Sequence, residues 1–135
     1  MQRGGMDDLV EAAVSARARA YAPYSRFLVG AAVRTESGAV FAGCNVENAA
    51  YPQGVCAEAG AISAMVAAGE RRIVEVVVAG AGTMPVTPCG GCRQKLREFA
   101  AAGAVVRMVD AAGVELARAT LEALLPMSFG PENLK

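Results

Sequence analysis

The sequence predicts an α/β fold of three layers, α/β/α, around a mixed sheet of about five strands. A helix pattern opens the chain, a hairpin pattern follows, and the order strand, helix, strand after residue 73 predicts two parallel neighbouring strands. A hairpin and a parallel pair in one sheet make that sheet mixed, and helices then pack on its faces. The length of 135 residues suits one domain with a real core, which we expect to span residues 1–135.

The first half of the chain predicts a helix, a hairpin and a second helix. Residues 6–23 have acidic residues in the first turn, apolar residues at helical spacing and a proline as the stop signal, which predicts a helix. In residues 27–47 two strand-like runs flank a turn at Ser37 and Gly38, which predicts a β-hairpin. The alanine-rich segment 55–68 precedes a glycine, as expected of a buried helix.

The second half of the chain predicts the parallel pair and its closing elements. The β-branched run 73–81 is typical of a central strand. Residues 88–103 begin with a proline and end with a glycine, and their apolar residues favour a helix. Residues 104–110 predict a second strand, 111–116 a short edge strand, and 119–126 a last helical turn or two.

Composition and charge exclude several classes of function. Thirteen basic residues balance thirteen acidic ones, so no overall positive field attracts a nucleic-acid backbone. No apolar run reaches transmembrane length and the start of the chain lacks a signal-peptide pattern, so we expect a cytoplasmic protein without a membrane partner. The hydrophobic content of 54% fits a compact protein with a surface buried between subunits. In a reducing compartment, four cysteines suggest metal ligands, catalytic thiols or small buried residues.

Three cysteines and one glutamate form a candidate metal centre. The stretch CAEAG places Cys56 two residues before Glu58, and PCGGC places Cys89 three residues before Cys92. All four residues open predicted helices, where the helix dipole and unpaired N–H groups favour thiolates. Three thiolates on zinc leave the fourth tetrahedral position open, which is the arrangement of a catalytic site.

Two other interpretations of the cysteines are open at this point. The C-x-x-C pair could be a redox pair, or all four cysteines could form a closed structural zinc site. Cys44 stands in a predicted hairpin strand with no ligand-like spacing, so we interpret it as a small buried residue. The redox interpretation gives no role to Glu58, which lies close enough to a ligand to carry protons without binding metal.

Four segments of the chain carry recognisable motifs. They are YAPYSRFLVGAAV at 21–33, GCNVENAAYPQGVCAE at 43–58, PCGGCRQKLREF at 88–99 and LLPMSFGPENL at 124–134. In this order they resemble the small, all-cysteine, free-nucleoside class of the zinc-dependent cytidine deaminase superfamily, over nearly the whole chain. The resemblance implies the fold of that superfamily, one Zn²⁺ per subunit and hydrolytic deamination of cytidine and 2′-deoxycytidine to uridine and 2′-deoxyuridine. Ammonia is the second product, and the expected setting is pyrimidine salvage.

The resemblance also assigns roles to individual residues. It implies that Cys56, Cys89 and Cys92 hold the zinc and that Glu58 is the proton shuttle. The positions implied to contact the nucleoside are Phe27, Asn45, Glu47, Tyr51, Ala57 and Phe129.

Those nucleoside contacts divide into three groups. Asn45 and Glu47, which alternate along a strand end, are implied to bind the ribose hydroxyls. Phe27 is implied to stack near the pyrimidine, although its apolar neighbours alone favour a core position, and the backbone of Ala57 is implied to contact the base. Tyr51 and Phe129 are implied to reach the site of a neighbouring subunit, because the small form of the family is a homotetramer.

Ala59 departs from the pattern of the all-cysteine relatives. Many of them place an arginine directly after the glutamate, where it can hydrogen-bond the sulfurs. Three thiolates on a divalent ion leave a formal charge of about −1, which weakens the Lewis acid. We expect Arg93 and the two helix dipoles to compensate, although Arg93 could also be a solvated helix residue.

Three alternative functions are open from the sequence. A deaminase of a modified cytosine nucleoside, such as an antibiotic, is compatible with Ala59, whereas Asn45 and Glu47 favour an ordinary ribose. An editor of RNA or DNA needs a basic groove and stacking surfaces, which the neutral charge and the absence of tryptophan disfavour. A structural zinc module would need Cys44 as a ligand and would not need Glu58.

Overall fold

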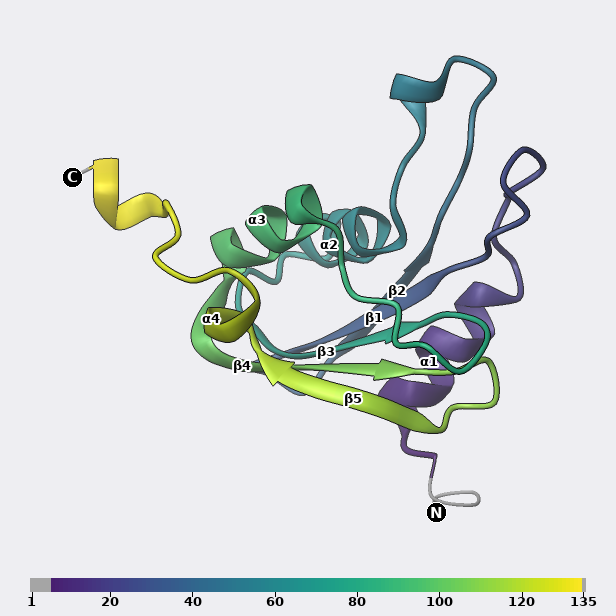
Figure 1. Cartoon of the computed structure of the whole chain (residues 1–135). Coiled ribbons are helices and arrows are strands. Elements are labelled where there is room, and N and C mark those ends of the chain that lie inside the picture. Colours follow the sequence, from purple (N-terminus) through teal and green to yellow (C-terminus); the bar gives the residue numbers. More distant parts are fainter. Residues whose placement is uncertain (1–5, 135) are drawn as a thin grey trace.

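The computed structural model describes residues 6–134, and it contains one five-stranded mixed sheet with helices on both faces (Figure 1). The expected absence of a signal peptide concerns residues 1–5 as well, which lie outside the described part. In the described range, none of the helices has the length and apolar character needed to cross a membrane. The elements are α1 (Asp8–Arg17), β1 (Gly30–Thr35), β2 (Val40–Cys44), η1 (Tyr51–Gln53), α2 (Ala57–Ala67), β3 (Ile73–Ala79), α3 (Gly90–Phe99), β4 (Ala100–Val109), β5 (Glu115–Thr120), α4 (Leu121–Leu124) and η2 (Pro131–Leu134).

The sheet has the strand order β2-β1-β3-β4-β5. β1 is antiparallel to both β2 and β3, β3 and β4 are parallel, and β5 is antiparallel to β4. The predicted hairpin and the predicted parallel pair, joined through α3, are therefore both confirmed.

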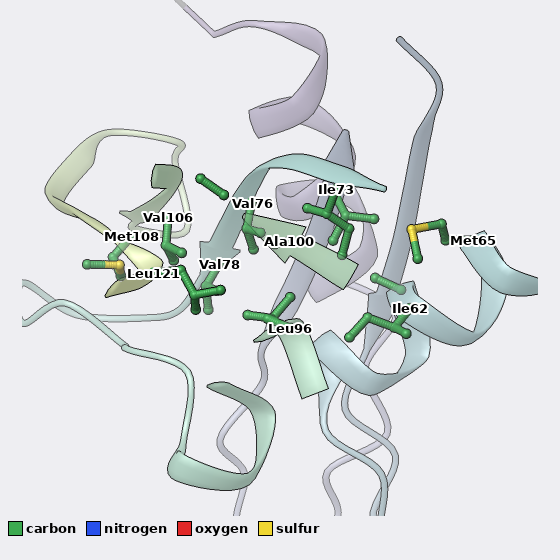
Figure 2. Close-up of a cluster of buried hydrophobic side chains, with 13 residues drawn as sticks. Ile62, Met65, Ile73, Val76, Val78, Leu96, Ala100, Val106, Met108 and Leu121 are labelled. Carbon is green, nitrogen blue, oxygen red and sulfur yellow. The ribbon is translucent and has the colours of Figure 1, made fainter. Parts of the chain in front are cut away.

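Side chains of the central strands alternate between two apolar clusters, one on each face of the sheet. Figure 2 shows the larger cluster, in which Ile62, Met65 and Leu96 from α2 and α3 pack with Val76 and Val78 of β3. On the opposite face, residues of α1 pack with neighbouring residues of β1, β3 and β4. This arrangement confirms the three-layer α/β/α prediction.

The first helix is shorter than the sequence predicts. Asp7 caps α1 by accepting a hydrogen bond of 2.9 Å from the N–H of Val10, and the helix ends at Arg17 rather than near residue 23. The chain leaves the helix because Tyr21 pairs with a distant strand-like segment. Its N–H donates to the carbonyl of Asn45, and its carbonyl accepts from the N–H of Glu47.

The boundaries of the last elements also differ from the prediction. α3 ends at Phe99, not at residue 103, because Ala100 already pairs with Ile73 in the parallel part of the sheet. Strand pairing here overrides the helix preference of the alanines. Residues 111–114 form a turn organised by Asp110, so the edge strand β5 begins at Glu115 rather than at residue 111. The last helix, expected over 119–126, is the single turn α4.

Candidate active site

The N-termini of α2 and α3 converge and bring three thiols together. Cys56 is the residue directly before α2, Cys89 is the residue directly before α3, and Cys92 lies in the first turn of α3. Neither Cys56 nor Cys89 uses its sulfur as a helix cap. The three Sγ atoms lie within 4.8 Å of one another, so the grouping expected from the spacing forms in the structure.

A close contact between β2 and α2 fixes one half of this centre. A Cβ atom on Gly43 would lie 2.5 Å from the backbone nitrogen of Ala61 and 2.6 Å from the carbonyl oxygen of Ala57. Only glycine leaves room for α2 to approach the strand this closely. The start of α2, with Cys56 and Glu58, is therefore positioned directly by the sheet.

The three thiols fit a zinc ion in number, kind and spacing. Zinc bound by thiolates at about 2.3 Å holds its sulfurs about 3.8 Å apart, and the three sulfurs here lie within 4.8 Å of one another. Burial raises the pKa of the Cys56 and Cys92 thiols, whereas the backbone N–H of Cys92 lowers the pKa of Cys89. A cation among the sulfurs favours the thiolate form of all three, so the donor set suits a metal.

Cys44 does not belong to this group. Among residues 6–134, the cysteines and carboxylates that could share one metal ion are Cys56, Cys89 and Cys92. Cys44 lies at the end of β2 and is half-buried, rather than fully buried as the sequence suggests. The grouping has the ligand count of an open zinc site, not of a closed four-cysteine site.

Glu58 lies in the first turn of α2 with only 4% of its surface exposed. Burial raises the pKa of this carboxyl, while hydrogen bonds from its own backbone N–H and from the Cys92 thiol act in the opposite direction. The Glu58 carboxyl lies beside the thiols and accepts a proton more readily than the carboxyl of a surface glutamate. It is therefore suited to general acid–base chemistry.

Two segments project together from the body (Figure 1): residues 18–29, between α1 and β1, and residues 45–56, between β2 and α2. They contain four of the six expected nucleoside contacts, namely Phe27, Asn45, Glu47 and Tyr51. Tyr21 pairs with Val46, and Val46 pairs in turn with Val55, the residue directly before Cys56. Phe27, which the apolar run alone would place in the core, is 47% exposed.

The side chains of Asn45 and Glu47 both form hydrogen bonds with the segment 18–29. The amide of Asn45 accepts from the N–H of Val29 at 2.9 Å and donates to the carbonyl of Phe27 at 2.8 Å. The carboxylate of Glu47 accepts from the hydroxyl of Ser25 and from the N–H groups of Ser25 and Tyr24. The hydroxyl of Ser25 is the main cause of a lowered pKa at Glu47.

Ser25 is a site residue that sequence reasoning missed. The signal available was a small polar residue within the motif YAPYSRF, next to Arg26, whose φ of 61° marks a tight turn. Ser25 and Glu47 line a hollow of about 370 Å³ together with Tyr24 and Tyr51. Tyr51 packs edge-on against Tyr24 with ring centroids 6.2 Å apart, and 76% of its surface is exposed.

The remaining expected residues lie on α2, in the C-terminal segment and on α3. Ala57 is buried and directly follows Cys56. Phe129 is 57% exposed in the C-terminal segment, and this segment projects from the body on a different side from η1, which contains Tyr51 (Figure 1). Arg93 donates 2.7 Å and 2.8 Å hydrogen bonds to the carbonyls of Pro88 and Leu124, so both hydrogen bonds go to carbonyl oxygens and not to sulfurs.

A mixed sheet, three converging thiols and a buried glutamate at one of two helix N-termini define the class of a metal-dependent deaminase. The model of the family described as "Cytidine and deoxycytidylate deaminase zinc-binding region" matches residues 6–108, and the chain belongs to this family. Ligand chemistry and family thus agree on zinc as the cofactor.

Individual relatives match over nearly their whole length. The chain is 38% identical over 129 residues to a cytidine deaminase of Sporosarcina psychrophila, covering 96% of this chain and 94% of that protein. It is 39% identical over 126 residues to a cytidine deaminase of Halalkalibacterium halodurans, covering 93% and 95%. The crystal structure of cytidine deaminase from Burkholderia pseudomallei superposes with a TM-score of 0.83 at 43% identity, covering 90% of this chain and 96% of that chain.

Proposed function

We propose that this protein hydrolyses cytidine and 2′-deoxycytidine to uridine and 2′-deoxyuridine with release of ammonia, in cytoplasmic pyrimidine salvage. The observation that carries the proposal is the buried carboxyl of Glu58 beside three thiols that lie within 4.8 Å of one another. Membership of the deaminase family and relatives named cytidine deaminase support the same reaction.

Cys56, Cys89 and Cys92 would hold one zinc ion per subunit. With zinc held there, the pKa of a bound water molecule would fall to roughly 7, which would supply a nucleophile for C4 of the base at neutral pH. Glu58 takes the proton from this water and delivers it to N3 of the cytosine ring, and it later helps to protonate the leaving amine. One carboxyl serves in both directions because the transfers are consecutive, and its burial suits it to hold a proton between them.

Asn45, Glu47 and the segment 18–29, which contains Phe27, would orient the nucleoside. The amide of Asn45 keeps one N–H and one lone pair after its bonds to Val29 and Phe27, and the carboxylate of Glu47 keeps free lone pairs. These groups can bind the two ribose hydroxyls, while Phe27 covers the pyrimidine and the backbone of Ala57 contacts it. Arg93 would contribute positive charge near the thiolates while it holds the Pro88 carbonyl directly before Cys89.

A homotetramer would complete the site with side chains of neighbouring subunits. Tyr51 and Phe129 are 76% and 57% exposed, so both rings are accessible to a partner chain. Light scattering should give a mass near four times the 13.8 kDa of one chain.

A spectrophotometric assay tests the function: it follows the loss of ultraviolet absorbance as cytidine is deaminated, and it is run with and without a zinc chelator. Glu58→Gln should keep the zinc content of the wild type and lose deamination by at least about 10³-fold, because the proton carrier is gone. Cys44→Ala should keep both zinc and activity. A Cys44→Ala protein that loses zinc, with a Glu58→Gln protein that behaves as wild type, would support a structural zinc module instead.

A further inference from the structure

The C-terminal segment, residues 125–134, follows α4 and projects from the body of the molecule (Figure 1). Met127, Phe129 and Leu134 are 103%, 57% and 78% exposed. A cavity of about 660 Å³ lies between this segment, α4 and the start of β4, and Met127 and Ser128 line it. Apolar packing within the chain therefore does not explain the course of this segment.

Polar side chains of α3 hold the segment instead. Arg97 donates a 2.7 Å hydrogen bond from Nε to the hydroxyl of Ser128, and its Nη2 forms an ion pair with Glu132. Gln94 donates from Nε2 to the carbonyl of Phe129 at 2.9 Å. The segment is thus held at Ser128 and Glu132, on the two sides of Phe129, and at the backbone carbonyl of Phe129 itself.

The segment itself is shaped to receive these donors. Met127 has a φ of 49°, which is unusual for a residue other than glycine and turns the chain before Ser128. The N–H of Gly130 donates to the side chain of Asn133 at 2.8 Å, and the N–H of Asn133 returns to the carbonyl of Gly130. A Cβ atom on Gly130 would clash with the Arg97 guanidinium and with the Glu132 carboxylate.

Helix α3 carries both the proposed metal ligands and the hydrogen-bond donors that hold the C-terminal segment. Cys89 and Cys92 lie at its start, while Gln94 and Arg97 are three residues apart and share one face one turn later. The position of Phe129 is thereby fixed relative to the metal-binding end of α3, although the ring itself is left exposed.

We propose that Arg97 and Gln94 are positioning residues that hold the C-terminal segment so that Phe129 reaches the nucleoside site of a second copy of this chain. This inference rests on the proposed function. The receiving surface is the hollow beside Glu47 and Tyr51, which is open in the single chain and offers an aromatic wall to an incoming ring.

The first experiment compares Arg97→Ala with the matched control Arg118→Ala. Arg118 also pairs with a glutamate, Glu115, but on β5 and away from the C-terminal segment. Arg97→Ala should raise KM for cytidine about 10-fold, the equivalent of one or two lost hydrogen bonds, with zinc content and kcat close to wild type. Arg118→Ala should leave all three unchanged, and Arg97→Lys should restore part of the KM.

Hydrogen exchange separates failure of this inference from failure of the function. Amides of residues 126–134 should exchange faster in Arg97→Ala and also in Ser128→Ala, which removes only the hydroxyl that accepts from Arg97. Unchanged exchange in both variants overturns the anchoring whether or not the protein deaminates cytidine. Faster exchange without any change in KM overturns the role in the nucleoside site.

A mixed oligomer tests whether Phe129 acts on a second copy. Glu58→Gln subunits keep an intact C-terminal segment, and Arg97→Ala subunits keep an intact proton carrier. If Phe129 acts between copies, oligomers co-expressed from both chains should contain a fraction of active sites with the wild-type KM. A single population with the raised KM of Arg97→Ala means that the segment serves its own chain, which overturns the proposal.

Discussion

The carboxylate of Glu47 is held by three donors from one short turn. The hydroxyl and N–H of Ser25 and the N–H of Tyr24 all point to its oxygens. These donors keep the carboxylate ionised, since the hydroxyl of Ser25 lowers its pKa, and they fix its direction. If Glu47 binds a ribose hydroxyl as proposed, the hydroxyl would meet an acceptor that is already oriented, which would reduce the entropy lost on binding.

Replacing Ser25 by alanine should release this carboxylate. We expect Ser25→Ala to raise KM for cytidine about 5- to 10-fold with a small change in kcat, because the lost hydrogen bond acts on binding and not on proton transfer. Steady-state kinetics of cytidine deamination measure both constants. Ser37→Ala is the matched control, because the Ser37 hydroxyl donates to Glu70 at 3.0 Å in the hairpin turn. Equal KM values in the two variants would show that Ser25 does not orient Glu47.

Residues of the site were predictable where their chemistry is local. Cys89 and Cys92 are one helical turn apart in sequence, and Glu58 follows Cys56 by two residues, so spacing grouped the members of each pair, whereas the resemblance implied that the two pairs share one site. Ser25 lies 22 residues from Glu47, and their contact depends on the pairing of two projecting segments that no local pattern encodes.

At the scale of elements, the packing of α2 on β2 decides where the first thiol lies. Gly43→Ala places a methyl group 2.5 Å from the backbone nitrogen of Ala61, and backbone at this distance must move. We expect a loss of about 2–3 kcal/mol in the free energy of unfolding and weaker zinc binding, because Cys56 shifts away from α3. Denaturant unfolding and competitive zinc titration measure the two effects.

Gly60, on the other side of the same contact, is the control. A Cβ atom there meets its nearest neighbour at 3.5 Å, which is an ordinary contact. Since alanine is the better helix former by up to about 1 kcal/mol, Gly60→Ala should keep or raise stability and keep zinc. Similar destabilisation by both substitutions would mean that the close approach does not position α2.

Element boundaries could be predicted only where the local signal agrees with the tertiary contact. The parallel pair β3 and β4 follows from β-branched runs with a helix between them. The end of α3 was missed because the alanines after Phe99 favour a helix by themselves, yet they pair with β3. The end of α1 was missed for a related reason, since Tyr21 leaves the helix to pair with a segment that begins 24 residues later.

At the scale of the whole molecule, Arg107 of β4 connects four elements and is only 11% exposed. Its guanidinium lies 2.8 Å from the carboxylate of Asp7, the residue that caps α1. It also lies 2.8 Å from the carboxylate of Glu75 in β3, and this second contact is an ion pair without hydrogen-bond geometry. Glu115 of β5 lies 3.8 Å away and also pairs with Arg118.

The pKa directions in this cluster set the sign of its pH dependence. Burial acts to raise the pKa of Asp7, but the N–H of Val10 and the guanidinium of Arg107 outweigh it, so this pKa is lowered. The pKa of Glu115 is lowered mainly by the hydrogen bond from Arg118. A lowered folded-state pKa stabilises the protein above the unfolded pKa of about 4, and this contribution is lost as the pH falls through the folded value.

Arg107→Met should therefore destabilise the protein most at neutral pH. Asp7 and Glu75 then lose the cation between them while Glu115 keeps only Arg118, and we expect the free energy of unfolding to fall by about 2–3 kcal/mol at pH 7. The deficit should shrink toward pH 4, because the unpaired carboxylates of the variant take up protons earlier than those of the wild type. Urea unfolding at both pH values measures the change, with Arg118→Ala, whose side chain is 59% exposed, as a control of little effect. A deficit that is the same at both pH values would mean that lost packing of the arginine stem, and not charge, accounts for it.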